Sequence, residues 1–270
     1  MSEPFILMDG PMGTELAARG VSTRLPLWSA SALEDAPEVV AQIHRDYVAA
    51  GAEVITTNTF RTQRRTAGAK WRRLTSLACE LAREAAGDAR VAGSIAPLAD
   101  CYEPERSNPA HWHEHEAMAA LLATRCDLLL CETFPHPGEA LAAARAALAT
   151  GKETWVALTA GPDASLMSPE TMVETMHRLV EEGVHACLVN CTPAPSTLAY
   201  LRAMEAVGVQ FGAYANAGEV DDAIGWRSDP SVGAAKYRAH AQTWINAGAR
   251  IIGGCCGTGV KHVEALAQVQ

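Results

Sequence analysis

The chain has 270 residues, of which 49% are hydrophobic and 20% charged, so it can bury a sizeable core. Its net charge of −9 argues against nucleic acid or an anionic membrane surface as a partner. No apolar run approaches the roughly 18 residues of a membrane span, and the start shows no secretory signal pattern. We therefore expect a cytoplasmic protein whose eight cysteines are reduced thiols rather than a disulfide scaffold.

Short apolar runs alternate with helical patterns along the whole chain. The strands are predicted at Phe5–Met8, Glu53–Thr57, Arg90–Ile95, Asp127–Cys131, Thr154–Thr159, His185–Asn190, Gln210–Tyr214 and Arg250–Gly253. Between the first two, Pro37–Val48 has helical spacing, with Pro37 in the first turn and Gly51 as the stop. A second helix is expected to begin at Ser168, an N-cap residue followed by proline.

Several predicted strands are almost wholly apolar, as in Leu128–Cys131. Such strands are buried on both faces, which is typical of a parallel sheet covered by helices. Eight strands that mostly alternate with helices predict a (β/α)₈ TIM-type barrel, with an open doubly wound sheet as the alternative. No repeat, low-complexity stretch or linker divides the chain, so we expect one domain over residues 1–270.

Polar side chains follow the predicted strands at the positions where a barrel places its active site. Carboxylate, amide, phenol and thiol groups occur there, at Asp9, Asn58, Glu132, Asn190, Cys191, Tyr214, Asn216, Cys255 and Cys256. Since the carboxyl ends of parallel strands meet at one rim, these groups are expected to converge. This convergence from separate parts of the chain indicates an active site.

Two adjacent cysteines, Cys255 and Cys256, lie in a glycine-rich loop after the last strand. Neighbouring cysteines rarely bridge each other, because one trans peptide unit does not fit disulfide geometry. Two thiolates on one soft metal ion suit the pair better, and Cys191 at another strand end offers a third ligand. Three thiolates leave one tetrahedral position open, as in catalytic zinc sites.

Each of these features also has a simpler structural interpretation. Asp9 could cap the segment that follows it, and Glu132 could form a cap or a surface pair. The remaining cysteines are expected to be small buried hydrophobes, namely Cys79, Cys101, Cys126, Cys131 and Cys187.

Two further clusters attract attention but favour surface structure. The histidine-rich run His111–His115 is predicted to be a solvated loop or helix start rather than a metal cluster. The basic stretch could hold an anionic substrate tail, although a solvated helix face is favoured; it comprises Arg61, Arg64, Arg65, Lys70, Arg72 and Arg73.

With these residues in view, the chain resembles the homocysteine S-methyltransferase family over nearly its whole length. The segments that carry the resemblance are Asp9–Leu16, Pro26–Ala30, Ala49–Phe60, Cys131–Phe134, Val189–Thr192, Tyr214–Gly218 and Gly253–Thr258. The two cysteine motifs, in this order and at this separation, are highly specific. One departure is Val260, where the family often has a proline that preorganises the first helical turn.

The resemblance implies a Zn²⁺ ion on Cys191, Cys255 and Cys256. It also implies that Asp9, the Gly10 backbone and Glu132 hold the amino acid end of homocysteine. Asn58, Asn190 and Trp28 are further candidate substrate-binding residues, Trp28 through its ring and a cationic donor, or else as a core or lid aromatic.

The expected reaction is zinc-dependent methyl transfer from a small donor to homocysteine, giving methionine. Pro26–Ala30 resembles enzymes that use S-methylmethionine or S-adenosylmethionine, whereas Thr57–Phe60 is similar to the homocysteine domain of cobalamin-dependent methionine synthases. The alternative is therefore a homocysteine-activating module served by a corrinoid protein or a betaine-like donor. A phosphate-binding barrel lyase is a remote rival, because Gly253–Gly254 and Gly257–Gly259 follow the last strand. A homo-oligomer is compatible with each of these functions.

Overall fold

Parallel strands form one sheet in the computed structural model, which describes residues 4–217 and 230–269. The strands of this described part are β1 (Ile6–Leu7), β2 (Val54–Thr56), β3 (Arg90–Ile95), β4 (Leu128–Phe134), β5 (Glu153–Thr159), β6 (Ala186–Pro193), β7 (Gln210–Asn216) and β8 (Ile251–Gly254). Their order is β1-β8-β7-β6-β5-β4-β3-β2, and a parallel bridge between Met8 and Val54 joins the two ends. The sheet is thus closed into a barrel.

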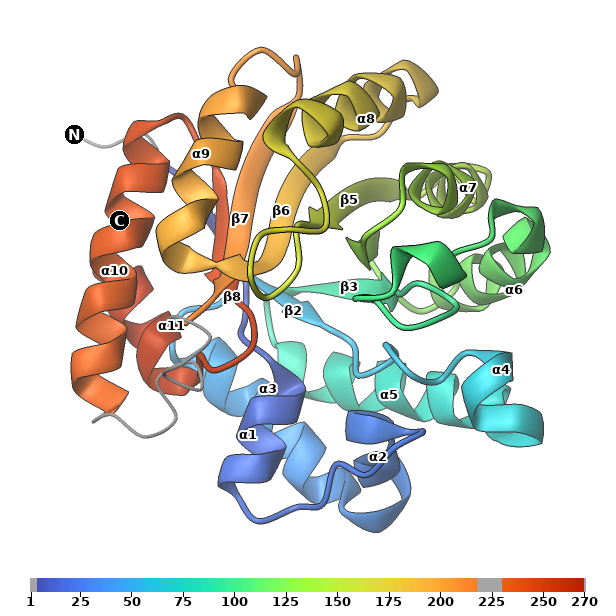
Figure 1. The fold of residues 1–270 in the computed structure, drawn as a ribbon. Coiled ribbons are helices and arrows are strands. Elements are labelled where there is room, and N and C mark those ends of the chain that lie inside the picture. Colours follow the sequence, from blue (N-terminus) through green and yellow to red (C-terminus); the bar gives the residue numbers. More distant parts are fainter. Residues whose placement is uncertain (1–3, 218–229, 270) are drawn as a thin grey trace.

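Helices surround the barrel on the outside (Figure 1). They are α1 (Met12–Ala18), α2 (Ala32–Asp35), α3 (Pro37–Ala49), α4 (Arg64–Ala67), α5 (Trp71–Ala86), α6 (Trp112–Ala123), α7 (Pro137–Leu148), α8 (Pro169–Glu182), α9 (Ala194–Met204), α10 (Pro230–Asn246) and α11 (Val260–Ala267). Short 3₁₀ turns lie in the loops, at η1 (Trp28–Ser31), η2 (Gly68–Lys70), η3 (Pro104–Arg106) and η4 (Pro109–His111). The last helix, α11, contacts α3, so the helical layer closes where the sheet does. The (β/α)₈ prediction is confirmed.

Alternation along each strand explains why the strands are apolar throughout. In β4, Leu128 and Leu130 belong to the cluster that fills the barrel, whereas Leu129 and Cys131 belong to the layer between strands and helices. Both faces are therefore removed from water, as expected for parallel strands. Trp155 of β5 is the largest fully buried side chain inside the barrel.

The two helices predicted in detail are present. Helix α3 begins at Pro37, as predicted, and buries Val40, Ile43 and Tyr47 on one face, with Val39 half-buried beside them. The same face also buries His44, which a search for apolar residues alone does not select. At α8, the Ser168 side chain accepts a hydrogen bond from the Thr171 backbone N–H, as an N-cap does.

Strands that form the site extend beyond their predicted ends, β7 by two residues to Asn216 and two others further. Strand β4 continues to Phe134 and β6 to Pro193, three residues beyond the predicted ends in each case. Both extensions contain a shift in pairing register, between Cys131 and Phe134 and between Asn190 and Pro193. None of the helices in the described ranges is long and apolar enough to cross a membrane.

Candidate active site

A cavity of about 340 Å³ opens at the carboxyl ends of the strands. Most of the strand-end groups singled out from the sequence line it, namely Asp9, Gly10, Asn58, Glu132, Cys191, Tyr214, Cys255 and Cys256, together with Trp28. Asn190 and Asn216 are not among the lining residues, although both are buried and Asn190 lies beside Cys191. The carboxyl ends of the strands thus bring these distant residues to one place.

Three cysteine sulfurs meet in this cavity. The Sγ atoms of Cys191, Cys255 and Cys256 all lie within 4.8 Å of one another. Cys191 and Cys255 are joined as a disulfide here, with their Cα atoms 5.6 Å apart. The expectation that all eight cysteines are free thiols is therefore wrong for this pair, because their Cα separation falls within the ordinary range for a disulfide.

The backbone at the cavity is strained in a way that aims side chains inward. Trp28, Thr133 and Cys191 line the cavity and have positive φ angles of 48°, 61° and 46°. Non-glycine residues adopt this region at a cost and tend to do so at functional sites. The register shifts in β4 and β6 contain Thr133 and Cys191, and a bulge of this kind redirects a side chain.

Hydrogen-bond donors surround the Cys191 sulfur. Asn190 Nδ2 lies 3.7 Å from Cys191 Sγ, and Thr133 Oγ1 lies 3.9 Å from it. Asn190 Nδ2 also donates to Thr133 Oγ1 at 2.7 Å, which fixes both groups. Groups of this kind orient a metal ligand and tune its basicity.

Once the Cys191–Cys255 disulfide is reduced, the three cysteines are chemically suited to a soft metal ion. Zinc–sulfur bonds of about 2.3 Å in a tetrahedron place the sulfurs about 3.8 Å apart. The bonded pair must separate to reach that spacing, and all three sulfurs already lie within 4.8 Å of one another. Burial, with a smaller contribution from Glu132, raises the pKa of the Cys256 thiol. Since the protein disfavours an isolated thiolate here, thiolate formation needs a compensating cation.

Two buried carboxyl groups, Asp9 and Glu132, lie in the same cavity. Asp9 accepts hydrogen bonds from the Thr56 backbone N–H at 2.7 Å and the Thr56 hydroxyl at 3.0 Å. Ser94 Oγ donates to Glu132, and Tyr214 donates to it through its hydroxyl at 3.1 Å. Within the described residues, neither carboxyl forms an ion pair, in contrast to the cap or surface pair that the simpler interpretation allows.

Burial is the dominant influence on both carboxyl groups. It raises the pKa of Asp9 to about 8 against the opposing hydrogen bonds of Thr56, with Glu132 nearby adding to the shift. Burial also raises the pKa of Glu132, while Ser94 and Tyr214 oppose the change. A pair of buried carboxyls without a counter-charge is a site that a bound cation would stabilise.

Trp28 forms one wall of the cavity, and its position depends on close packing. Its ring meets Phe60 edge-on, with centroids 5.9 Å apart. A Cβ atom at Gly13 would lie 2.4 Å from the Trp28 ring, so only glycine permits this approach. Asn58 exchanges hydrogen bonds with the neighbouring Ser29, at 2.7 Å and 2.9 Å, and so anchors the turn that carries Trp28.

The glycine loop after β8 has little capacity left for phosphate. Its backbone N–H groups are already used: Gly254 donates to Asp9 O, Gly257 to Thr14 Oγ1, Thr258 to Cys255 O, and Val260 to Glu15 Oε1. A phosphate site needs such groups to be free. A proline, which the family often has at position 260, would lack the backbone N–H that Val260 donates to Glu15.

The remaining clusters from the sequence lie outside the cavity or apart from the metal site. The five other cysteines are free and buried, as expected, although Cys101 lines the cavity wall. The run from His111 begins α6, with His113 exposed, but His115 is buried and lies 3.3 Å from Glu139. The prediction of a solvated segment is thus wrong for His115, because it occupies the inward face of the helix.

Sequence reasoning missed several residues that hold or line the site. Thr56, Ser94 and Thr133 are hydroxyl partners of the carboxyl and thiol groups, and each lies in a strand. Their positions near the carboxyl ends of strands were the sequence feature from which they could have been predicted. Asp100 and Tyr102 line the cavity from the loop after β3, and no strand pattern marks them. Arg61, which the sequence singled out only as part of the basic stretch, lines the cavity from the turn after β2.

Comparison with known proteins agrees with this geometry. A sequence profile of the homocysteine S-methyltransferase family matches residues 6–270. The chain belongs to the homocysteine S-methyltransferase family. It is therefore an enzyme of the methyltransferase class. A homocysteine S-methyltransferase of Bacillus subtilis, YbgG, is 32% identical over 98% of this chain and 94% of its own length.

Solved structures and more distant relatives extend the comparison. The homocysteine methyltransferase MmuM of Escherichia coli is 26% identical in its metallated form, with a TM-score of 0.83, and covers 99% of this chain and 97% of its own. Its oxidized form has a TM-score of 0.81 at 28% identity, with the same coverage. Two relatives at 27% identity over 97% of this chain are named for different donors: an S-methylmethionine–homocysteine S-methyltransferase of Pongo abelii, 77% covered, and a betaine–homocysteine S-methyltransferase of Rattus norvegicus, 71% covered.

Proposed function

We propose that this enzyme transfers a methyl group from a small sulfonium donor to the thiol of L-homocysteine, giving methionine, with Zn²⁺ held by Cys191, Cys255 and Cys256. The observation that carries the proposal is the meeting of three sulfurs, within 4.8 Å of one another, at the wall of a cavity that also contains two buried carboxyls. Family membership supplies the acceptor class. The metal and the donor are inferred from the chemistry of the donor atoms and the cavity wall.

The carboxyls suit the amino acid end of homocysteine. Asp9 and Glu132 offer negative charge to an ammonium group, which would offset the burial that disfavours their ionised forms. The backbone of Gly10 lies beside them, in close contact with Tyr47, and is the proposed partner of the homocysteine carboxylate. Asn190 and Asn58 would act one step further out, by orienting Cys191 and the turn that carries Trp28.

Free thiols have a pKa near 8.5 and are mostly protonated at neutral pH. When bound, zinc would supply charge that favours the thiolate form of the substrate sulfur. The substrate sulfur forms a bond to the donor methyl carbon while the bond between that methyl and the sulfonium sulfur breaks. The electron pair of the broken bond stays on the donor sulfur, which leaves as a neutral thioether. No general base acts at carbon. The protein aligns the two sulfurs with the methyl group, which can contribute up to ~7–11 kcal/mol.

A cationic donor fits the aromatic wall at Trp28, whose ring packs edge-on against Phe60. The Phe60 ring itself already has the Arg61 guanidinium 5.6 Å from its centroid. Cations within about 6 Å of such ring faces are attracted to them. A betaine-like donor also carries a cationic quaternary ammonium group, and a corrinoid protein would need no such small-molecule wall. The aromatic wall therefore favours a small cation delivered directly to this chain.

The test is methionine formation by the purified, reduced and zinc-loaded chain. Homocysteine is offered separately with S-methylmethionine, S-adenosylmethionine, betaine and methylcobalamin. We expect turnover with a sulfonium and no requirement for a corrinoid partner. Turnover with betaine alone would reassign the donor, and methyl transfer from methylcobalamin alone would favour the corrinoid-served alternative.

A further inference from the structure

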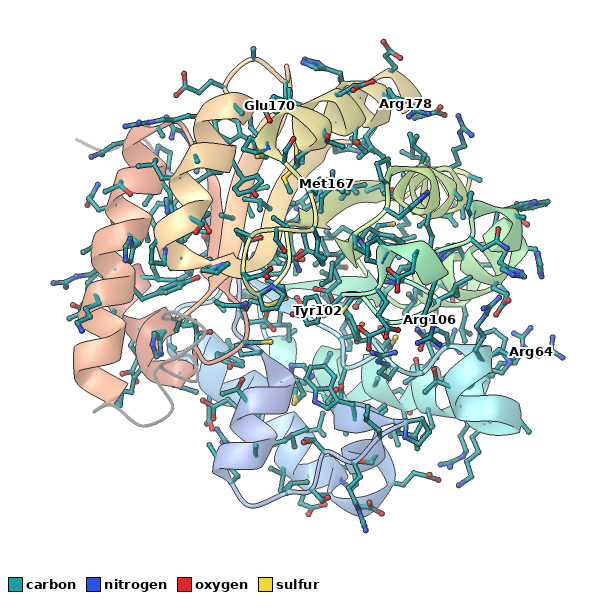
Figure 2. All side chains as sticks on the ribbon, viewed as in Figure 1. Arg64, Tyr102, Arg106, Met167, Glu170 and Arg178 are labelled. Carbon is teal, nitrogen blue, oxygen red and sulfur yellow. A yellow bond between two sulfur atoms is a disulfide. The ribbon has the colours of Figure 1, made fainter. Side chains whose placement is uncertain are left out.

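One basic residue of the chain has a place unlike its neighbours. Arg61 lies in the turn between β2 and α4, and its side chain is 16% exposed and lines the cavity. The other members of its basic stretch, Arg64, Arg65, Lys70, Arg72 and Arg73, are all exposed, as expected for a solvated face. In Figure 2, Arg64 lies at the edge of the molecule, whereas Tyr102 lies near its centre. The favoured interpretation of a solvated face is thus wrong for Arg61.

Arg61 faces an acidic partner across the cavity mouth. Its guanidinium Nη2 lies 3.5 Å from Asp100 Oδ2, in the loop after β3, and the Asp100 side chain is 42% exposed. Neither charge is therefore fully satisfied by the other, because an ion pair at this distance and exposure is weak. Both remain available to a ligand in the cavity.

The turn that carries Arg61 is firmly anchored. Thr62, the next residue, is buried and donates to Thr59 O, and Gln63 donates to Pro97 O at 3.0 Å. The carboxylate of Asp100 accepts a hydrogen bond from the Tyr102 backbone N–H at 2.9 Å. Since little ordering is needed on binding, the two charges form a preorganised pair.

Charge is divided between two ends of the cavity. The deep end holds Asp9 and Glu132, whereas the mouth holds one acid, Asp100, and one base, Arg61. Among the described residues that line the cavity, Arg61 supplies the single cationic side chain. A second ligand with a negatively charged group therefore has one cationic partner in this lining, which is Arg61 at the mouth.

We propose that Arg61 and Asp100 form a subsite for the α-amino acid group of the methyl donor, with Arg61 binding its carboxylate and Asp100 its ammonium. This inference rests on the proposed function and commits it to an amino acid sulfonium of the S-methylmethionine type. A carboxylate accepts paired hydrogen bonds from a guanidinium, and an ammonium donates to a carboxylate. The Phe60 ring already has the Arg61 guanidinium 5.6 Å from its centroid, so Trp28, which also lines the cavity, would face the sulfonium.

This subsite distinguishes among donors by their functional groups. Betaine has a carboxylate but no ammonium hydrogens, so it could use Arg61 and not Asp100 as a hydrogen-bond acceptor. A corrinoid carries no α-amino acid group at all. The transfer itself stays balanced: one methyl group passes from the donor sulfonium to homocysteine, the homocysteine thiol proton goes to solvent, and the products are two molecules of methionine.

The experiment uses three donors with the reduced, zinc-loaded chain: S-methylmethionine, its analogue without the carboxylate, and its analogue without the ammonium group. We expect kcat/KM for S-methylmethionine to exceed that of either analogue by at least about 10-fold, since each charged hydrogen bond is strong. In R61Q, the ratio of S-methylmethionine to the carboxylate-free analogue should fall towards 1. In D100N, the ratio of S-methylmethionine to the ammonium-free analogue should fall towards 1.

Matched variants separate a subsite from a structural ion pair. R64Q removes an exposed arginine three residues away, outside the cavity, and should leave both ratios unchanged. R61Q should raise KM for the donor and not for homocysteine, whereas Asp9→Asn should raise KM for homocysteine. If R61Q and D100N slow all three donors equally, or leave both ratios intact, the subsite is refuted while the methyltransferase function stands. Failure of the wild-type chain to methylate homocysteine with any sulfonium would overturn both.

Discussion

Cys191 shows how much of the site depends on single residues. Its φ angle of 46°, its place in the β6 register shift and the two donors near its sulfur all serve to aim one thiol at Cys255 and Cys256. Strain of this kind persists only where surrounding structure holds it. The proposed zinc site thus depends on the position and orientation of Cys191, which another buried cysteine would not reproduce.

The chain offers a matched control for this residue on the same strand. Cys187 is fully buried between strands and helices, four residues before Cys191. Cys191→Ala should abolish zinc binding and reduce kcat by at least ~100-fold, because the metal contributes several kcal/mol. Cys187→Ala should cost about 1 kcal/mol of unfolding free energy and keep the zinc. Zinc content and methionine formation measure both, and equal zinc in the two variants would remove Cys191 from the ligand set.

At the scale of an element, α3 carries a buried histidine that makes the fold sensitive to acid. The His44 ring is fully buried, and neither ring nitrogen has a hydrogen-bond partner among the described residues. Burial, with a smaller contribution from Arg45, lowers the pKa of His44 to about 4. The folded state therefore keeps this ring neutral at pH values where the unfolded chain, with a pKa near 6.5, binds a proton.

This difference predicts a loss of stability as pH falls. The contribution of His44 is present above pH ~6.5 and is lost between there and pH ~4, which amounts to roughly 2 kcal/mol between pH 7 and pH 5. His44→Leu should reduce the fall in unfolding free energy over that interval, measured by urea titration. His177→Gln, at an exposed position of α8, is the control and should follow the wild type. An unchanged pH dependence in His44→Leu would contradict the assigned pKa.

Strands β4 and β6 show why element ends are hard to predict. Glu132, Thr133 and Thr192 are polar, and polar residues after an apolar run usually indicate a loop. In the structure they continue the strand, because each finds a partner on another part of the barrel end. Which partner each residue meets depends on how β4 pairs with β5 and β6 with β7, and the local sequence does not encode that pairing.

At the scale of the whole molecule, the alternation of apolar runs and helical patterns was enough to predict the barrel. The same pattern located the cysteines, Asp9 and Glu132 at one rim, because parallel strands place their carboxyl ends together. For Arg61 the sequence favoured a solvated face over a substrate contact, and it did not mark Asp100 at all, since a loop's direction depends on tertiary contacts such as that of Gln63 with Pro97. The single domain over residues 1–270 remains a prediction, as does the role of the motif that ends on Gly218, outside the described residues.

The central claim is that three cysteines hold one zinc ion on which methyl transfer depends. The most direct measurement is a titration of reduced, metal-free protein with Zn²⁺, in which bound zinc and methionine formation from homocysteine and S-methylmethionine are followed together. Activity should rise in proportion to bound zinc and level off at about one ion per chain. Full activity in the metal-free protein would contradict the account.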